Sequence, residues 1–426
     1  MTRKLIDDCF VTDRDRISHA DALALLRARI SVVTGIERVP LAELHGRILA
    51  EPAIATSPVP AHTNAAVDGY SFANVDAATA AADGLPIDGR AAAGHPLATS
   101  APTQTAVRIF TGAVLPDGHD TVAMQEDCER LDQSTRSRVR IPLGLKRGAN
   151  VRRAGEDVAA GSTLIGAGSI LRPQDVAALA SIGLAEAQVY RRLRVAILSS
   201  GDEVTQPGQA LGVGQVYDAN APMLLGLARM AGADATIVGV ADDTVASLEA
   251  QLSAASSTYD VVISSGGASQ GEEDYLVRAL DRLGKRHLWQ IAIKPGRPMA
   301  FGQIGDCVIV ALPGNPVAVF VCFLVYVFPM LRTLSGGHWR EPRRWLLPAA
   351  FAMPQRKIGR REFWRGVLVA QDGTMAVEKF ARDGSGLISG LRAADGLIDV
   401  AEDVAGVRPG DLVSFIPFSE FGIAGH

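Results

Sequence analysis

Five turns in the second half of the chain, with the residues around them, carry glycines and charged side chains of the types that bind phosphate groups and metal ions in other proteins. Lys294 and Arg297 bring positive charge, and Glu203, Asp242 and Asp274 bring carboxylates. Glycine turns that open a helix let backbone N–H groups approach an anion and aim the helix dipole at it. Mg²⁺ is a hard cation that shares carboxylate ligands with substrate phosphates. These residue types predict a phosphate-bearing ligand that binds together with a metal ion.

Each of these turns follows a short apolar segment that is typical of a β-strand. The predicted strands are Val195–Leu198, Thr236–Val240, Val261–Ser264, Leu288–Ile293 and Val308–Leu312, and the turns after them are 199–203, 242–243, 265–271, 294–297 and 313–316. Helices are predicted over Ala221–Met230, Thr244–Ala255, Glu272–Leu283 and Pro316–Leu334, with Asn220 capping the first of them. Because strands and helices alternate, we expect a parallel, doubly wound sheet. Ligands of such sheets bind beyond the carboxyl ends of the strands, so the turns are expected on one rim.

Several of these residues also have a purely structural interpretation. The turn 266–271 matches neither GxGxxG nor GxxxxGK[ST], so it is equally consistent with a tight strand-to-helix connection. Glu272 and Glu273 fit the first turn of a helix, where the dipole favours acidic side chains. Asp242 and Asp243 are also candidates for capping the next helix.

The remainder of the chain indicates smaller regions on either side of the α/β segment. A helix is predicted over 18–30, with Ser18 and Asp21 as a capping box. Short apolar runs between glycines and prolines indicate a small β domain over 84–145, and the alanine-rich stretch 77–93 suggests a mobile loop. From 148 to 183 the chain is expected to return to the first region, with a helix starting near Pro173.

The last ninety residues read as short strands with glycine turns, which predicts a second small β domain. Residues 340–365 hold eight Arg or Lys against two Glu, a pattern more typical of a solvated face than of a binding site. Asp68 and Asp157 fall in turns and look like turn residues from the pattern alone.

Composition excludes several classes of protein. The chain has 426 residues and a formal net charge of −4, which argues against a nucleic-acid binder. Its four cysteines lie far apart, so neither a disulfide scaffold nor a structural zinc site is expected. Residues 307–331 carry no charge, but Pro313, Pro316 and Pro329 interrupt them, which favours a core helix over a membrane span. The first ten residues show no signal-peptide pattern, so we expect a cytoplasmic protein with neither nucleic-acid nor membrane partners.

Several strings of the sequence closely resemble those of the MoeA family, the molybdopterin molybdenumtransferases related to the E domain of gephyrin. Three of them are SSGGASQGEEDY at 264–275, KPGRP at 294–298 and LPGNPV at 312–317. Five more fall in the same order as in the family: GRILA at 46–50, VDGY at 67–70, TGA at 111–113, RRAGED at 152–157 and SGDE at 200–203. Such an ordered set is far more specific than any single motif.

The resemblance implies an α/β multidomain fold with four parts. These are an elongated α+β N-terminal domain (15–60 and 146–186), a β insertion domain (61–145), a doubly wound, MogA-like α/β domain that binds molybdopterin (187–335) and a C-terminal β barrel-like domain (336–426). It also implies a homodimer, with the cleft formed between the α/β domain of one subunit and the N-terminal segments of the other.

The implied reaction inserts molybdenum from molybdate into adenylylated molybdopterin, with Mg²⁺-assisted cleavage of the phosphoanhydride and release of AMP. Implied partners are a MogA-type adenylyltransferase and acceptor molybdoenzymes or chaperones. The resemblance gives catalytic roles to Asp68, Thr111, Asp157, Glu203, Asp242 and Asp274, of which Glu203, Asp242 and Asp274 would hold the metal. Substrate contacts are expected from Gly266, Gly267, Ser269, Lys294, Arg297, Pro313, Gly314, Asn315, Arg360, Arg365, Ser385 and Ser389.

The chain departs from the family pattern at a few positions. Thr63, Ala65 and Val67 replace Asp, Ser and Met, which removes a carboxylate and a hydroxyl. Ala318 stands where Ser is frequent, and Arg297 stands where Lys is common and presents a planar fork instead of a point donor. Two alternatives stay open. The resemblance of the α/β domain alone to MogA allows a molybdopterin adenylyltransferase, and the changed segment 63–67 allows a non-catalytic molybdopterin-binding scaffold or carrier.

Overall fold

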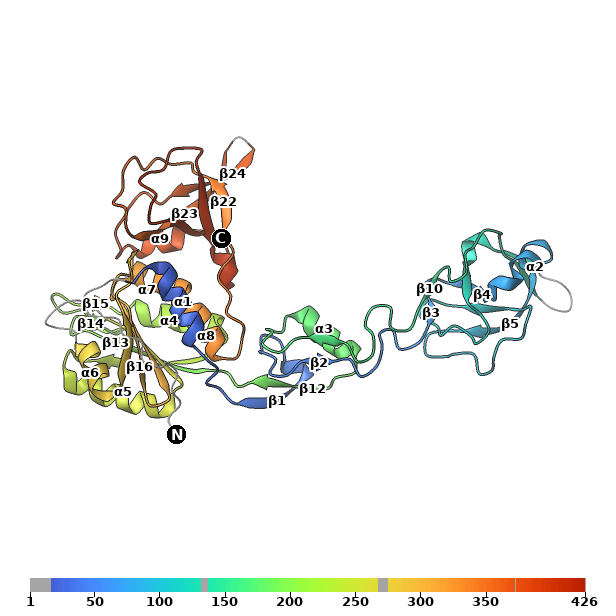
Figure 1. Cartoon of the computed structure of the whole chain (residues 1–426), viewed down its shortest axis with the longest axis horizontal. Coiled ribbons are helices and arrows are strands. Elements are labelled where there is room, and N and C mark those ends of the chain that lie inside the picture. Colours follow the sequence, from blue (N-terminus) through green and yellow to red (C-terminus); the bar gives the residue numbers. More distant parts are fainter. Residues whose placement is uncertain (1–16, 132–136, 267–274, 372, 426) are drawn as a thin grey trace.

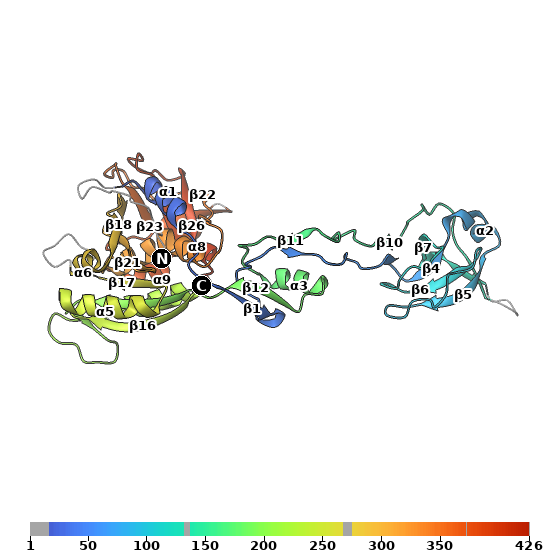
Figure 2. The ribbon, with the colours of Figure 1, turned by 60° about the horizontal axis from the view of Figure 1, so that its bottom comes forward.

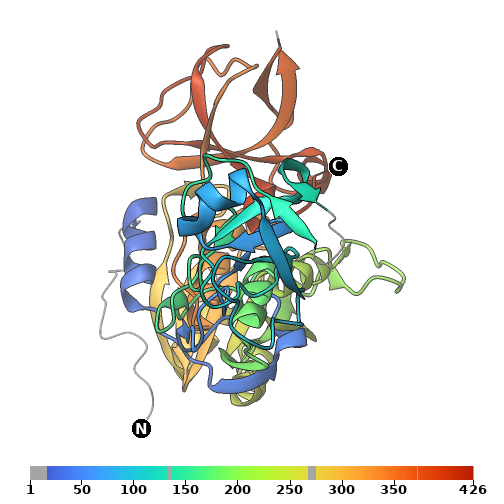
Figure 3. The same ribbon diagram turned by 90° about the vertical axis from the view of Figure 1, so that its right-hand side faces the viewer.

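The computed structural model describes residues 17–131, 137–266, 275–371 and 373–425 as an elongated molecule. One end holds an α/β domain with a C-terminal β domain packed beside it, and a separate small β domain forms the other end (Figure 1). A narrow middle region joins the two ends (Figure 2). Seen along the long axis, the C-terminal β domain rises from one side of the α/β domain (Figure 3). The α/β multidomain class expected from the sequence is confirmed.

The α/β domain is built on a six-stranded sheet of mixed direction. Its order is β16 (Asp234–Ala241), β13 (Arg194–Ser200), β17 (Val261–Ser265), β21 (Cys307–Leu312), β20 (Ala300–Ile304) and β18 (Lys285–Trp289). The first four strands are parallel, whereas β20 and β18 are antiparallel to their neighbours. The expectation of a parallel sheet is therefore wrong at β20, which runs against the other five strands of this sheet. The reason is that only Gly305 and Asp306 join β20 to β21, and a two-residue connection links only antiparallel strands.

Helices α4 (Asn220–Met230), α5 (Val245–Thr258) and α6 (Tyr275–Leu283) cover this sheet. Side chains alternate along β13, so that Val195 and Ile197 enter one core and Ala196 and Leu198 enter the other. Burial on both faces explains why these strands read as continuous apolar runs. Two short strands, β14 (Val204–Thr205) and β15 (Val216–Tyr217), pair in parallel after β13.

The longest helical segment consists of α7 (Pro316–Cys322), a π-helical turn over Phe323–Val327 and α8 (Phe328–Leu334). Pro329 has no N–H, and next to it the N–H of Phe328 donates to the carbonyl of Phe323, five residues back. Over Pro316–Leu334 this segment is long and apolar enough to span a membrane, yet 89% of its most apolar window is buried inside the protein. In this fold it is a core helix.

The N-terminal helix α1 (His19–Arg29) packs on the α/β domain. The Oγ atom of Ser18 accepts a hydrogen bond from the N–H of Asp21 at 3.1 Å, as the capping pattern predicts. Ala22 and Leu26 are fully buried in the core that also contains α7 and α8. This helix therefore belongs to the α/β end of the molecule.

The middle region is made of outgoing and returning segments that pair with each other. β1 (Ile36–Pro40) pairs with β12 (Glu186–Tyr190), β2 (Ala53–Ile54) with β11 (Thr163–Ile165), and β3 (Asn64–Ala65) with β10 (Val151–Arg152), all antiparallel. Helix α3 (Pro173–Ser181) contributes Leu179 to a small core with Leu44 and Leu171.

The far end is a small β domain inserted between β3 and β10. Its sheet has the order β7 (Thr121–Met124), β4 (Gly69–Phe72), β6 (Ala106–Ile109), β5 (Leu85–Ala91), β9 (Arg138–Arg140) and β8 (Glu129–Leu131), with helix α2 (Ala77–Ala82) beside it. The expectation of a mobile loop over 77–93 is wrong, because α2 and β5 occupy it and the side chains of Ala80 and Leu85 are fully buried.

The C-terminal β domain has the strand order β19 (Ile293–Lys294), β23 (Arg361–Gln371), β25 (Gly396–Val400), β26 (Leu412–Pro417) and β22 (Trp345–Pro348). A sixth strand, β24 (Thr374–Lys379), pairs with β23, and a bridge between Ala349 and Val377 links it back toward β22. Helix α9 (Ile388–Ala393) precedes β25.

Two sequence expectations are corrected in this domain. The predicted strand Leu288–Ile293 is divided, because Gln290 has a φ of 62° and β19 pairs with β23 instead of joining the α/β sheet. The basic run 340–365 is not simply a solvated face. Asp399, only 5% exposed, accepts hydrogen bonds from Arg361 Nε at 2.6 Å and Arg344 Nε at 2.9 Å.

Candidate functional site

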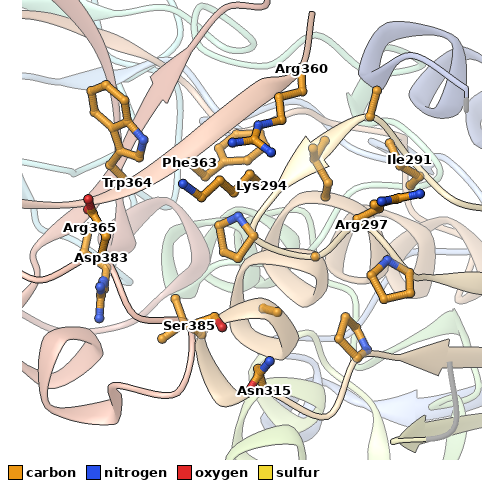
Figure 4. A pocket seen from close by; sticks show the side chains of 18 of the residues that line it. Ile291, Lys294, Arg297, Asn315, Arg360, Phe363, Trp364, Arg365, Asp383 and Ser385 are labelled. Atoms are coloured by element: carbon orange, nitrogen blue, oxygen red, sulfur yellow. The ribbon is translucent and has the colours of Figure 1, made fainter. Parts of the chain in front are cut away.

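A cavity of about 370 Å³ lies between the α/β domain and the C-terminal β domain, and we call it the basic cavity (Figure 4). Its cationic side chains come from the strands β19, β23 and β24 and from the turns that hold Arg297 and Arg360. The lining residues are 291–298, Pro313, Asn315, Val317, Ala318, Arg360, Phe363, Trp364, Arg365, Lys379, Phe380, Asp383 and Ser385.

Glu362 holds the cations at one side of the basic cavity. Its carboxylate is 3% exposed and accepts hydrogen bonds from Arg360 Nε at 3.0 Å and Trp364 Nε1 at 2.9 Å. Lys294 Nζ lies 4.0 Å away, because β19 places Lys294 opposite Glu362 on β23. Burial alone would raise the pKa of Glu362, but these hydrogen bonds and the charge of Lys294 outweigh it and lower the pKa. Glu362 therefore stays ionised and fixes Arg360 and Lys294.

Arg365 is the most enclosed cation of this cavity, with 6% exposure. Its guanidinium donates to the main-chain carbonyls of Leu387, at 2.9 Å, and of Arg382, and its Cζ atom lies 4.9 Å from the ring centre of Phe380. Burial lowers the pKa of Arg365, which still leaves it charged at neutral pH. Two carbonyls and a ring orient this charge, and the carboxylate of Asp383, which also acts on it, is already paired with Lys379. An anion in the cavity would therefore complete the environment of Arg365.

The turn that carries Lys294 and Arg297 is held tightly against α7. Gly296 has a φ of 106°, and a Cβ atom at this position would lie 2.3 Å from Cys322 Sγ. A side chain is therefore excluded by both conformation and space. Arg297 donates to Gln290 Oε1 at 3.3 Å.

A second cavity of about 520 Å³ lies at the carboxyl ends of the parallel strands, and we call it the strand-end cavity. It is lined by Ser199, Ser200, Glu203, Val204, 216–220, Ser265, Gly266, 314–316 and Gly386. Asn315 lines both cavities, so the two are neighbours.

Buried polar groups form the floor of the strand-end cavity. Asp218 accepts hydrogen bonds from Ser199 Oγ at 2.6 Å and from the N–H groups of Asn220 and Ala221 at 3.0 and 2.9 Å. The prediction that Asn220 caps α4 is therefore wrong, because the side chain of Asp218 accepts the first N–H groups of this helix. Asn220 instead donates from Nδ2 to Ser265 Oγ at 2.7 Å and to the carbonyl of Gly314 at 2.6 Å.

Two atoms in this cavity are buried without a hydrogen-bond partner among the described residues: Ser200 Oγ and Asn220 Oδ1. Buried polar atoms are normally satisfied, so these two are available to polar groups of a ligand. The backbone closes on them at Gly266, where φ is 97° and a Cβ atom would lie 2.5 Å from the carbonyl oxygen of Ser200.

The predicted metal ligands are only partly visible. Glu203 and Asp242 are both exposed and follow the neighbouring strands β13 and β16. Their turns are linked through Asp202 and Asp243, since the N–H of Asp243 donates to Asp202 Oδ1 at 3.1 Å. Within the described ranges no three His, Cys, Asp or Glu side chains come close enough to hold a metal ion. Asp274, with Gly267 and Ser269, lies outside those ranges.

The remaining predicted acidic residues lie in or beside the inserted β domain, far from both cavities of the same chain (Figure 1). Asp68 Oδ1 accepts hydrogen bonds from Thr111 Oγ1 at 2.6 Å and from the Thr111 N–H at 2.8 Å. These two bonds, led by that from the side chain, lower the pKa of Asp68. Asp157 is exposed in the turn after β10.

The structure thus brings seven of the twelve predicted substrate contacts into the basic cavity: Lys294, Arg297, Pro313, Asn315, Arg360, Arg365 and Ser385. Gly266 and Gly314 line the strand-end cavity, whereas Ser389 is exposed on α9 and lines neither. The sequence reasoning missed Glu362, Lys379 and Asp218. Asp218 could have been found from the sequence, because a carboxylate two residues before a helix is a typical N-terminal capping residue.

The architecture and the cavities define the class: a multidomain protein in which an α/β domain and a C-terminal β domain share a basic cavity. Residues 196–333 match the family description "probable molybdopterin binding domain", and residues 17–183 and 347–418 match the MoeA N-terminal region (domains I and II) and the MoeA C-terminal region (domain IV). The chain belongs to the MoeA family.

Relatives along nearly the whole chain agree. A molybdopterin molybdenumtransferase of Haemophilus influenzae is 35% identical over 388 residues, which cover 91% of this chain and 95% of the relative. Molybdopterin molybdenumtransferase 2 of Mycobacterium tuberculosis is 35% identical over 383 residues, 87% of this chain and 92% of the relative. A solved molybdopterin biosynthesis MoeA protein from Pyrococcus horikoshii is 29% identical, with a TM-score of 0.79 over 95% of this chain and 99% of that one.

Proposed function

We propose that this protein is a molybdenum insertase, which transfers molybdenum from molybdate to adenylylated molybdopterin and releases AMP. The observation that carries the proposal is the basic cavity, where Lys294, Arg360 and the enclosed Arg365 face one space beside the strand-end cavity. A tetrahedral dianion such as molybdate fits the first cavity, and a pterin phosphate fits the polar floor of the second. Asn315 lines both cavities, so one substrate can reach from one to the other.

The chain's own residues supply mainly positioning and charge. Glu362 keeps Lys294 and Arg360 in fixed places, and two carbonyls fix Arg365. Because these cations are oriented before the substrate binds, little reorganisation is needed when charge develops on oxyanions as the phosphoanhydride is cleaved. The orphan atoms Ser200 Oγ and Asn220 Oδ1 would orient the polar edge of the substrate in the strand-end cavity.

Mg²⁺ suits the chemistry of the exposed carboxylates, because it prefers oxygen ligands and keeps several waters. Glu203 and Asp242 would hold it, with Asp274 as the third expected ligand. When bound, the ion neutralises charge on the phosphate oxygens of the substrate.

A homodimer belongs to the same proposal. Asp68, Thr111 and Asp157 lie too far from the cavities of their own chain to act there (Figure 1). In a twofold dimer they would meet the cleft of the partner. Val216 and Tyr217, which border the strand-end cavity, are 54% and 47% exposed, and a second copy would cover such apolar surface.

We further propose that the protein works in the cytoplasm, receives its substrate from a MogA-type adenylyltransferase and delivers the cofactor to molybdoenzymes or their chaperones. Cys128, Cys307 and Cys322 are free thiols, in keeping with a reducing compartment.

The test is to mix the protein with adenylylated molybdopterin, Mg²⁺ and molybdate, and to measure AMP release and reconstitution of a cofactor-free molybdoenzyme. Molybdate-dependent AMP release with reconstitution supports an insertase. Consumption of ATP with molybdopterin would instead identify an adenylyltransferase. Tight binding without turnover would identify a carrier.

A further inference from the structure

A third cavity, of about 220 Å³, lies at the junction of the α/β domain and the C-terminal β domain. It is formed by α8, the linker 340–343 and the residues after β26, and we call it the junction cavity. Its lining residues are Phe328, Pro329, Arg332, Arg340, Glu341, Pro342, Arg343 and 419–421. None of them lines the basic or the strand-end cavity.

Arg332 is the central cation of the junction cavity. Its Nε atom is buried and has no hydrogen-bond partner among the described residues. Its Cζ atom lies 4.4 Å from the ring centre of Phe328, and that ring packs edge-on against Phe421 at 5.2 Å. A guanidinium stacked on an aromatic wall is oriented, while its unused donor still needs an acceptor.

The surrounding charges do not meet that need. Arg340 and Arg343 line the same cavity, and the charge of Arg340 adds to the effect of burial in lowering the pKa of Arg332. The carboxylate of Glu420 accepts the main-chain N–H of Arg343 at 3.2 Å. Glu341 Oε2 lies 3.7 Å from Arg344 Nη1, and Arg344 is not among the residues that line the cavity. Three arginines and two glutamates thus line the cavity, an excess of one positive charge, and neither carboxylate is a hydrogen-bond partner of Arg332 Nε.

We propose that the junction cavity is a binding site for a tetrahedral oxyanion, such as a phosphate group, separate from the basic and strand-end cavities. Guanidinium forks match oxyanion geometry, and an anion here would satisfy Arg332 Nε and offset the repulsion between Arg332 and Arg340. Because the lining comes from both domains, the bound anion would also hold the C-terminal β domain against α8. The inference does not depend on the proposed function.

The experiment titrates inorganic phosphate into the full-length protein by calorimetry, in phosphate-free buffer. The background is Lys294→Gln/Arg360→Gln, which weakens anion binding in the basic cavity. Into it we introduce Arg340→Gln, an exposed site where misfolding is not expected, and separately Arg332→Met. Arg408→Gln, an exposed arginine of the same domain away from the cavity, is the matched control.

We expect the background and the Arg408→Gln protein to bind phosphate equally, and each junction variant to bind it about tenfold more weakly. At the same phosphate concentration, Tm should also rise more in the background protein than in the Arg340→Gln variant. Molybdate in place of phosphate tests which oxyanion the site prefers. Unchanged phosphate affinity in Arg340→Gln, or loss of all binding in the background alone, would overturn the proposal.

Discussion

Replacing Arg365 by Gln tests whether the enclosed cation of the basic cavity serves ligand binding as well as stability. The substitution removes the hydrogen bonds to the carbonyls of Leu387 and Arg382. Each bond from a charged donor contributes about 1.5–3 kcal/mol, and Gln is too short to replace both, so the free energy of unfolding should fall by about 3 kcal/mol. Loss of the charge should weaken molybdate binding by about tenfold or more.

Urea unfolding measures the first effect and calorimetric titration with molybdate the second. Arg382→Gln is the matched control, because Arg382 is exposed and contacts Arg365 only through its main-chain carbonyl, which the substitution keeps. We expect this control to match the unmodified protein in both assays. If Arg365→Gln lowers stability but leaves molybdate affinity unchanged, Arg365 is structural and the anion lies elsewhere.

Three further predictions follow from other groups. The lowered pKa of Glu362 means that its stabilising contribution is present above pH 4.5 and lost as pH falls through its folded pKa, so Tm should drop more between pH 6 and 3 than in Glu362→Gln; parallel curves would contradict this. Burial, helped by nearby arginines, lowers the pKa of His19 from 6.5 to about 4, so the unfolded chain binds a proton that the folded one does not, and stability should fall by about 3 kcal/mol from pH 6.5 to 4. His19→Gln should flatten that part of the stability profile. Finally, Asp68→Asn and Lys294→Gln, each inactive alone, should on mixing regain about a quarter of normal AMP release, because half the dimers would carry one intact cleft; no recovery would refute a shared cleft.

The sequence predicted site residues correctly where they follow the carboxyl end of a predicted strand. Gly266, Lys294 and Asn315 all fall within three residues of the end of a predicted strand, and all line a cavity. The rule that ligands bind at carboxyl ends therefore located them. For Lys294 the strand itself differs from the prediction, since β19 belongs to the sheet of the C-terminal β domain and not to the α/β sheet.

Long-range partners were beyond sequence reasoning. Nothing local distinguishes Glu362 from a solvated charge in a basic run, because its role depends on Trp364 and Lys294 meeting it across two strands. Strand direction was misjudged at β20 for a related reason. A short apolar run predicts a strand but carries no information on which neighbour it pairs with.

The pairing of β3 with β10 has a consequence for folding. These two strands are the points where the chain enters and leaves the small β domain, and they are joined to each other by antiparallel hydrogen bonds. The segment between them contains two apolar cores of its own, around Phe72 and around Val107. The chain therefore enters and leaves this domain at the same place. Such a segment can acquire its structure before the rest of the chain is made, and could be replaced by a short turn without disturbing the α/β core.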